Sequence, residues 1–138
     1  MNEPETILEM LGGRQREARV LAVIGLSDDP GKPSYAVSAY MQQHGYKIYP
    51  VNPAIESVLG EKSYRSLAEL PVKPDVVNVF RRASYLPTVV EEMLSLGLKS
   101  LWAQMGIWNP EAAASAEAGG IRVVMDRCIL VEHRRLFG

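Results

Sequence analysis

One loop holds residues whose types and spacing suit the binding of a phosphate group. It runs from Gly25 to Ser34, between an apolar run, Val20–Ile24, and a helical pattern, Tyr35–His44. The loop contains two glycines, two hydroxyl side chains and one amine: Gly25, Gly31, Ser27, Ser34 and Lys32. Where a strand leads into a helix, free backbone N–H groups and the positive end of the helix dipole attract anions. The loop therefore predicts a phosphate-binding turn.

The loop departs from two common nucleotide motifs. A dinucleotide fingerprint needs G-x-G-x-x-G and an acidic residue after the second strand. Here Leu-Ser-Asp-Asp-Pro-Gly follows Gly25, and the next apolar run ends in Val51-Asn52-Pro53. A P-loop needs G-x-x-x-x-G-K-[ST], but Gly31 comes one residue too late and Pro33 replaces the Ser or Thr. Binding of NAD and hydrolysis of ATP are both disfavoured.

Two interpretations of the loop stay open. In the first, Lys32 and the hydroxyls of Ser27 and Ser34 cradle a phosphate with the surrounding N–H groups. In the second, the loop is a plain turn in which Ser34 or Asp29 caps the following helix. Asp28 and Asp29 oppose a highly charged ligand unless they point outward.

Three more strand ends carry side chains that suit a nucleotide. Asn52-Pro53 forms a rigid, uncharged end that suits a wall against a ring or ribose, although a simple turn is the commoner outcome. Phe80-Arg81-Arg82 combines an aromatic ring for stacking with guanidinium groups for phosphate. At the fourth strand end, Gln104 and Met105 are expected to face a ligand, whereas Trp102 is expected in the core.

We expect no catalytic residues and no metal site. The two histidines, His44 and His133, do not pair with cysteine or carboxylate at metal-ligand spacing. A Gly-x-Ser-x-Gly elbow is also absent. The single cysteine, Cys128, has no internal disulfide partner, which fits a reducing cytoplasm. It is expected to be a small buried side chain, with a reactive thiol as the alternative.

Apolar runs alternate with helical patterns, which predicts an α/β fold. The expected strands are Arg19–Ile24, Tyr46–Val51, Asp75–Phe80, Leu98–Gln104 and Ile121–Met125. The expected helices are Thr6–Leu11, Tyr35–His44, Ser66–Leu70, Tyr85–Leu96, a segment from Asn109-Pro110 to Gly119-Gly120, and Ile129–Leu136. Strands this apolar are typical of a parallel sheet covered on both faces. We therefore expect a Rossmann-like doubly wound five-stranded parallel sheet in the order 3-2-1-4-5, with helices on both faces and a ligand crevice where the first and fourth strands end.

Length and composition limit the function classes. The chain has 138 residues, which predicts a single domain over residues 1–138. A net charge of −1 gives no general attraction for nucleic acid or acidic membranes. The acidic start, Met1–Glu5, is unlike a signal peptide, and no apolar run approaches the ~20 residues that span a bilayer. We expect a cytoplasmic domain with neither nucleic acid nor membrane as a partner.

Four segments, in chain order, resemble the small single-domain CoA-binding proteins of bacteria and archaea. They are Val23–Ser34, His44–Pro53, Asp75–Arg81 and Asp126–Leu136. That family is similar in fold to the CoA-binding domain of the succinyl-CoA synthetase α subunit. The resemblance implies a Rossmann-like sheet whose ligand is coenzyme A.

The resemblance also implies which residues contact CoA. The loop would meet the phosphates, the second and third strand ends would flank the nucleotide, and the fourth would lie along the pantetheine arm. The implied residues are Gly25, Ser27, Asp28, Asp29, Pro30, Lys32, Ser34, Asn52, Pro53, Phe80, Arg81, Ala103, Gln104 and Met105. The synthetase loop is richer in glycine, whereas here Pro30 and Pro33 each remove an N–H donor. The synthetase's catalytic histidine lies in a further domain, so ligase activity does not carry over.

We therefore expect a protein that binds CoA or acyl-CoA without transforming it, as a sensor or carrier with a protein partner or as a homo-oligomer. One alternative is a Rossmann-type enzyme that uses NAD or another nucleotide. Another is an interaction module whose pocket is vestigial. A reactive Cys128 would allow a mixed disulfide with CoA.

Overall fold

Short runs of buried aliphatic residues form one parallel sheet in the computed structural model, which describes residues 1–138. Its strands are β1 (Val20–Ile24), β2 (Lys47–Val51), β5 (Val76–Val79), β6 (Ser100–Ala103) and β7 (Arg122–Val124), in the order β2-β1-β5-β6-β7. Every side chain of β5 and β6 is buried. Such strands need cover on both faces, because alternate side chains point to opposite sides of a sheet.

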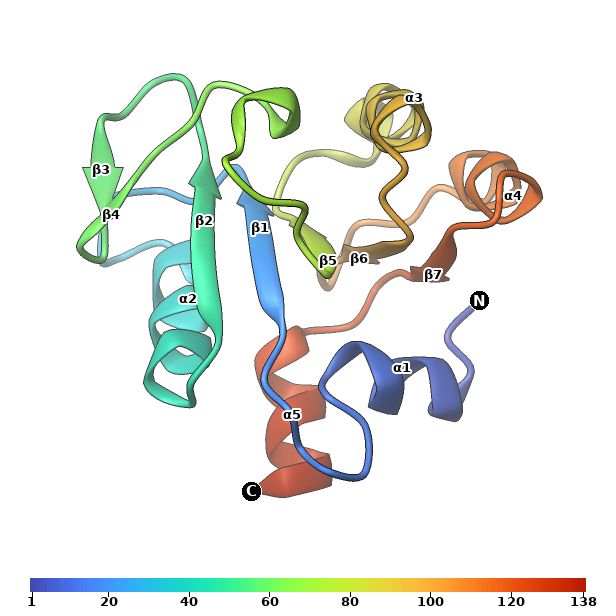
Figure 1. The fold of residues 1–138 in the computed structure, drawn as a ribbon, viewed down its shortest axis with the longest axis horizontal. Helices are drawn as coiled ribbons and strands as arrows, with labels where there is room; N and C mark the ends of the chain where they lie inside the picture. The colour runs from blue at the N-terminus through green and yellow to red at the C-terminus, as the bar shows by residue number, and fades with distance from the viewer.

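Two helical layers supply that cover (Figure 1). On one face lie α3 (Leu86–Leu96) and α4 (Pro110–Ala118), and on the other lie α1 (Pro4–Met10), α2 (Pro33–Gln43) and α5 (Ile129–Phe137). Along β1, Ala22 and Ile24 pack toward α3 and α4, whereas Leu21 and Val23 pack toward the other helices. None of the helices combines the length and hydropathy required to cross a membrane.

The expected fold class is confirmed: this is a Rossmann-like, doubly wound α/β sheet with helices on both faces. An isolated parallel bridge between Tyr64 and Val51 adds a position outside β2. With this bridge counted, the order reads 3-2-1-4-5 from Tyr64 to β6, and β7 follows as a sixth position. The segment assigned to the third position was wrong. Residues 75–80 form β5, which pairs with β1 instead. Apolar periodicity identifies a strand but does not specify its neighbour, so this assignment depended on tertiary packing.

The segment between β2 and β5 contains structure that the sequence pattern left undefined. A small antiparallel hairpin joins β3 (Ser57–Val58) to β4 (Glu61–Lys62). The expected short helix at Ser66–Leu70 is a single 3-10 turn, Leu67–Glu69, and a second such turn, Ala83–Tyr85, precedes α3. In the sheet, the order reverses between β1 and β5. The sequence prediction had placed this reversal between β1 and the fourth predicted strand, which is β6.

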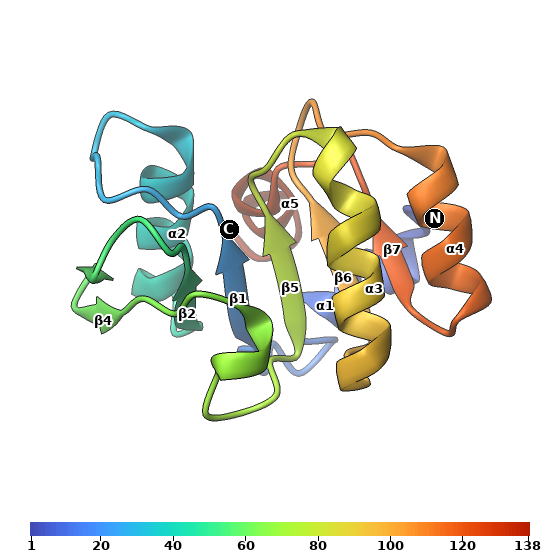
Figure 2. The ribbon, with the colours of Figure 1, turned by 90° about the horizontal axis from the view of Figure 1, so that it is seen from above.

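The carboxyl ends of β1, β5 and β6 meet at one edge of the sheet, as Figure 2 shows. The loop after each strand begins at this edge. In doubly wound sheets, ligands bind where the strand order reverses, outside the carboxyl ends. The loop at residues 25–34 and the end of β5 flank that point.

Candidate functional site

Gly25 follows β1 in a backbone conformation that favours glycine. Its φ is +83°, and a Cβ at this position would lie 3.5 Å from the side chain of Arg81. The Phe80 N–H donates to the carbonyl of Ile24 at 2.9 Å, so the ends of β1 and β5 are held together. A larger residue at Gly25 would strain the turn that begins the loop.

Hydrogen bonds within the loop set its shape. The Ser27 N–H donates to Ser34 Oγ at 3.0 Å, and the Asp29 N–H donates to Ser27 Oγ at 3.0 Å. The Gly31 N–H donates to Asp29 Oδ1 at 2.9 Å. The plain-turn interpretation expected Ser34 or Asp29 to cap α2, and neither does so. The N-cap residue is Lys32, and its side chain makes no capping bond. The hydroxyls of Ser27 and Ser34 therefore hold the shape of the loop, because each accepts a hydrogen bond from a loop N–H group.

Donors remain available where the loop meets α2. The N–H groups of Asp28 and Ser34 donate to no acceptor in the protein. α2 begins at Pro33, which lacks an N–H, so the proline removes a donor that the first turn would leave unpaired in any case. The exposed amine of Lys32 stands beside this helix end. The arrangement can attract an anion through charge, dipole and direct donors.

A cavity of about 650 Å³ adjoins the loop on the α2 and α5 side of the sheet edge. Seven of the sequence-predicted residues line it: Gly25, Ser27, Lys32, Ser34, Phe80, Gln104 and Met105. The other lining residues are Pro33, Val37, Ile107, Cys128 and Val131. Lys32 is the only charged side chain among the twelve, so the cavity is cationic at one end and largely apolar elsewhere.

A second hollow of about 430 Å³ lies on the α3 side of the same edge. It brings Pro53 and Arg81 together with Arg65 and Tyr85. The Arg81 guanidinium lies 5.1 Å from the centroid of the Tyr85 ring, a cation–π contact between two exposed side chains. The two cavities flank the end of β1, one on each side.

Five predicted residues line neither cavity. Asp28, Asp29 and Pro30 are exposed residues of the loop. Asn52 is used internally: its Nδ2 donates to the Leu26 carbonyl at 3.0 Å and its Oδ1 accepts from Ala54 N–H at 2.9 Å. The side chain of Ala103 is fully buried against α3 and α4.

Gln104 is the most constrained side chain of the larger cavity. It is 4% exposed, and its Nε2 donates to Asn78 Oδ1 at 2.7 Å. Its Oε1 accepts from the Ile129 N–H at 3.4 Å, at the amino end of α5. Gln104 therefore joins β5, β6 and α5 beside the ligand space.

Sequence reasoning missed Asn78 and the contribution of α5. Asn78 is buried within β5. The sequence feature that could have identified it is a single amide residue inside an otherwise apolar strand. Cys128 and Val131 line the cavity from the start of α5. Nothing local in the sequence indicated that this last helix would border the first loop.

The groups with shifted pKa values lie away from both cavities. Burial raises the pKa of Tyr46 to about 12. Burial lowers the pKa of His133, and the charges of His44 and Arg16 lower it further. These residues line a separate hollow of about 210 Å³. No three His, Cys, Asp or Glu side chains are grouped closely enough to hold a metal ion.

Comparison with a protein-family model identifies the group to which this architecture belongs. The model of the CoA binding domain matches residues 19–134, which include all of the strands and both cavities. The chain belongs to the CoA binding domain family.

Similar sequences are found in a protein of comparable length and in a small part of longer enzymes. The chain is 48% identical over 119 residues to the uncharacterized protein YneT of Bacillus subtilis, covering 86% of this chain and 87% of that one. It is 32% identical over 99 residues to ADP-forming acetate–CoA ligase II of Archaeoglobus fulgidus, covering 70% of this chain but only 15% of the ligase. A solved Thermus thermophilus structure is 39% identical, with a TM-score of 0.83 and coverage of 87% and 91%.

Proposed function

We propose that this CoA binding domain binds CoA or an acyl-CoA at the carboxyl edge of β1, β5 and β6. The observation that carries the proposal is the 650 Å³ cavity, which has a cationic helix end on one side and apolar walls on the other. Coenzyme A has the same polarity, because it joins a pyrophosphate to a long, mostly uncharged pantetheine arm. Membership of the family supports the same ligand.

The proposed orientation follows the charges. The pyrophosphate lies at Lys32 and the free N–H groups of the loop. The pantetheine arm passes Gln104 and Met105 toward Val131. The nucleotide lies toward Arg81, which contacts the Tyr85 ring.

We further propose that the domain holds this ligand without transforming it, as a sensor or a carrier that acts with another protein. The larger cavity is lined by neither a histidine nor a carboxylate, the usual general acids and bases. Glu91 and Glu92 border only the smaller hollow, at its α3 wall. Prolonged incubation with acetyl-CoA should leave the thioester intact, and release of free CoA faster than in buffer would contradict a purely binding role.

Calorimetric titration of the full chain tests the ligand. CoA and acetyl-CoA should bind saturably, whereas NAD and ATP should bind weakly or not at all. Tight NAD binding without a CoA signal would favour a Rossmann-type enzyme. If none of the four binds, the cavity is vestigial and the proposal is wrong.

Matched variants locate the binding site. Lys32→Ala and Arg81→Ala should each weaken CoA binding roughly tenfold or more, because each removes a charge-assisted contact with phosphate. Arg82→Ala is the control: Arg82 is an exposed arginine beside Arg81 that lines neither cavity. Equal losses for Arg81→Ala and Arg82→Ala would mean that the effect is general electrostatics rather than contact.

A further inference from the structure

The opposite edge of the sheet has a cavity of its own. It has a volume of about 340 Å³ and lies where the chain enters β1, β5, β6 and β7. This is the amino edge, where the parallel strands begin, and the proposed CoA site lies at the opposite edge, where they end. Its size is at the lower end of the range for small-molecule pockets.

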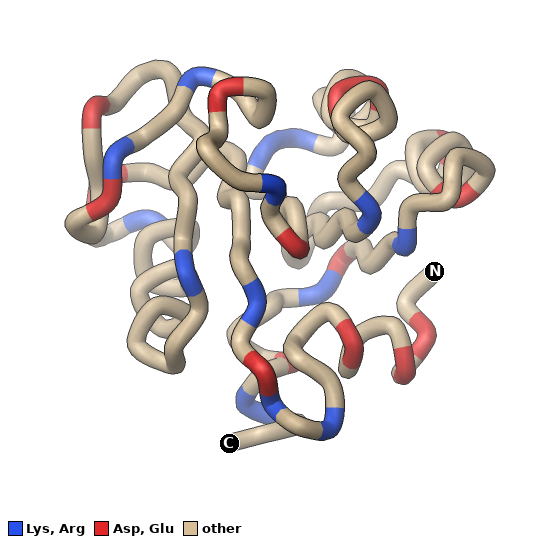
Figure 3. Tube along the Cα trace, in the orientation of Figure 1, with Lys and Arg blue, Asp and Glu red and all other residues tan.

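Basic side chains predominate around this cavity. Arg19, Lys73, Lys99 and Arg122 line it, against two carboxylates, Glu9 and Asp75, which leaves an excess of two positive charges. The chain as a whole carries −1, so this excess is local. Figure 3 shows the basic positions gathered near the starts of β5, β6 and β7.

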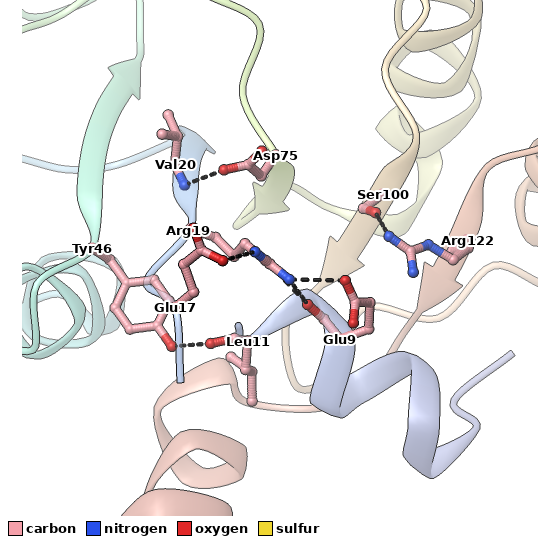
Figure 4. A network of polar contacts seen from close by, with 9 residues as sticks. All are labelled: Glu9, Leu11, Glu17, Arg19, Val20, Tyr46, Asp75, Ser100 and Arg122. Atoms are coloured by element: carbon pink, nitrogen blue, oxygen red, sulfur yellow. Dashed lines mark hydrogen bonds and ion pairs between the residues drawn. The ribbon is translucent and has the colours of Figure 1, made fainter. Parts of the chain in front are cut away.

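Both carboxylates are already engaged by the protein (Figure 4). Glu9 Oε1 accepts from Arg19 Nη2 at 2.8 Å, and the Glu9 carbonyl accepts from the same guanidinium at 3.1 Å and 3.2 Å. Asp75 Oδ2 accepts from the Val20 N–H at 2.7 Å. The Glu9–Arg19 pair neutralises one cation, and the Asp75 carboxylate holds the start of β1.

The other three cations have no carboxylate partner within 4.0 Å. The only hydrogen bond of the Arg122 side chain is donated by Nη2 to the buried Ser100 Oγ at 3.2 Å (Figure 4). Lys73 and Lys99 make neither ion pairs nor side-chain hydrogen bonds. Three cations around one hollow repel one another unless an anion lies between them.

Capping of α3 does not account for these lysines. The helix ends at Gly97 in the left-handed conformation, and the N–H groups of Gly97 and Leu98 donate to the carbonyls of Leu94 and Met93. Backbone N–H groups therefore satisfy the carbonyls of Met93 and Leu94 in the last turn. The amines of Lys73 and Lys99 are therefore free to donate hydrogen bonds to a ligand.

We propose that the amino-edge cavity is a second anion site, which binds a small doubly charged oxyanion, either a phosphate or a dicarboxylate. The Arg122 guanidinium presents a planar fork of donors that matches such groups, and the two lysines add charge from the neighbouring strand ends. The Ser100 hydroxyl adds a further donor. This site is independent of CoA binding.

Amide chemical shifts of the full chain, recorded during titration with inorganic phosphate and separately with succinate, test the proposal. The Lys32→Ala protein is used, because it lacks the cation of the carboxyl-edge loop. Amides near Gly97, Ser100 and Arg122 should shift saturably with one or both anions. Phosphate alone would assign a phosphate group as the ligand, and succinate alone would assign a dicarboxylate.

Charge-matched variants complete the test. Lys99→Gln with Arg122→Gln should weaken the saturable shifts roughly tenfold or more. Lys62→Gln with Arg82→Gln removes the same charge from exposed positions elsewhere and should leave the affinity unchanged. Lys73→Gln, outside every helix and strand, gives the same test should the double variant be poorly folded. Shifts that never saturate with either anion, or equal losses in both double variants, would overturn the proposal.

Discussion

Hydroxyl and amide side chains near the proposed CoA site are already hydrogen-bonded within the protein. Ser34 accepts from Ser27, Asn52 holds the Leu26 carbonyl, and Gln104 is bonded on both sides. The Ser34 and Asn52 bonds hold loops, and the Gln104 bonds join β5 to the start of α5, before any ligand arrives. Preorganisation of this kind reduces the entropy that binding would otherwise cost.

Ser34→Ala tests that interpretation at the residue scale. The substitution leaves the Ser27 N–H without its acceptor, which costs about 1–3 kcal/mol where the group stays desolvated. Because the loop would lose its fixed shape, CoA affinity should fall several-fold, with a lower thermal midpoint. Ser57→Ala, at an exposed serine of β3, should change neither quantity in calorimetry or thermal unfolding. A Ser34→Ala protein with unchanged CoA affinity would show that the loop needs no such bond.

At the scale of elements, α2 and α5 are joined by an aromatic cluster away from the proposed site. Tyr40 Oη and His133 Nδ1 are 2.9 Å apart, and the His44 ring lies 5.0 Å from that of His133. Other groups that face His133 are Tyr46, Phe137 and the charged Arg16, while Arg134 lies over Tyr40. A positive charge on His133 would lie close to the charge of Arg16.

Stability should therefore fall in mild acid. Burial holds the pKa of His133 below its usual value, so the unfolded chain binds more protons than the folded one near and below pH 6.5. The free energy of unfolding should thus decrease as pH falls from about 7 to about 5. Urea unfolding at each pH measures it. His133→Gln should flatten the dependence more than His44→Gln does, and an unaltered slope in His133→Gln would refute the assignment.

At the scale of the whole molecule, the sheet is stabilised by packing on both faces. Trp102, in the middle of β6, is fully buried toward α1, α2 and α5, and its Nε1 donates to the Arg127 carbonyl at 2.8 Å. It connects the central sheet to the loop that leads into α5. The second tryptophan, Trp108, is half exposed after the same strand.

Trp102→Ala should cost roughly 3–5 kcal/mol of unfolding free energy, because it opens a core cavity and leaves the Arg127 carbonyl unpaired. That is a large share of the ~5–15 kcal/mol typical of a domain. Trp108→Ala is the matched control and should stay within about 0.5 kcal/mol of the parent. Denaturant unfolding compares the two, and similar losses would contradict the assigned packing.

The sequence alone was enough to predict the α/β class, all five strands of the sheet and the loop at residues 25–34. Apolar runs, glycine and proline breaks, and the glycine after β1 are local signals, because each depends on backbone geometry within a few residues. The resemblance to CoA-binding proteins rested on short segments of the same kind. These are properties that neighbours along the chain can determine.

Tertiary structure alone decided which of these local pieces meet. It placed β5 beside β1, brought the start of α5 and Cys128 to the first loop, and turned Asn52 and Ala103 away from the cavities. It also gathered Lys73, Lys99 and Arg122 at the amino edge. The physical reason is that crossovers between parallel strands set these contacts, and the direction of a crossover depends on packing across the whole sheet rather than on any local pattern.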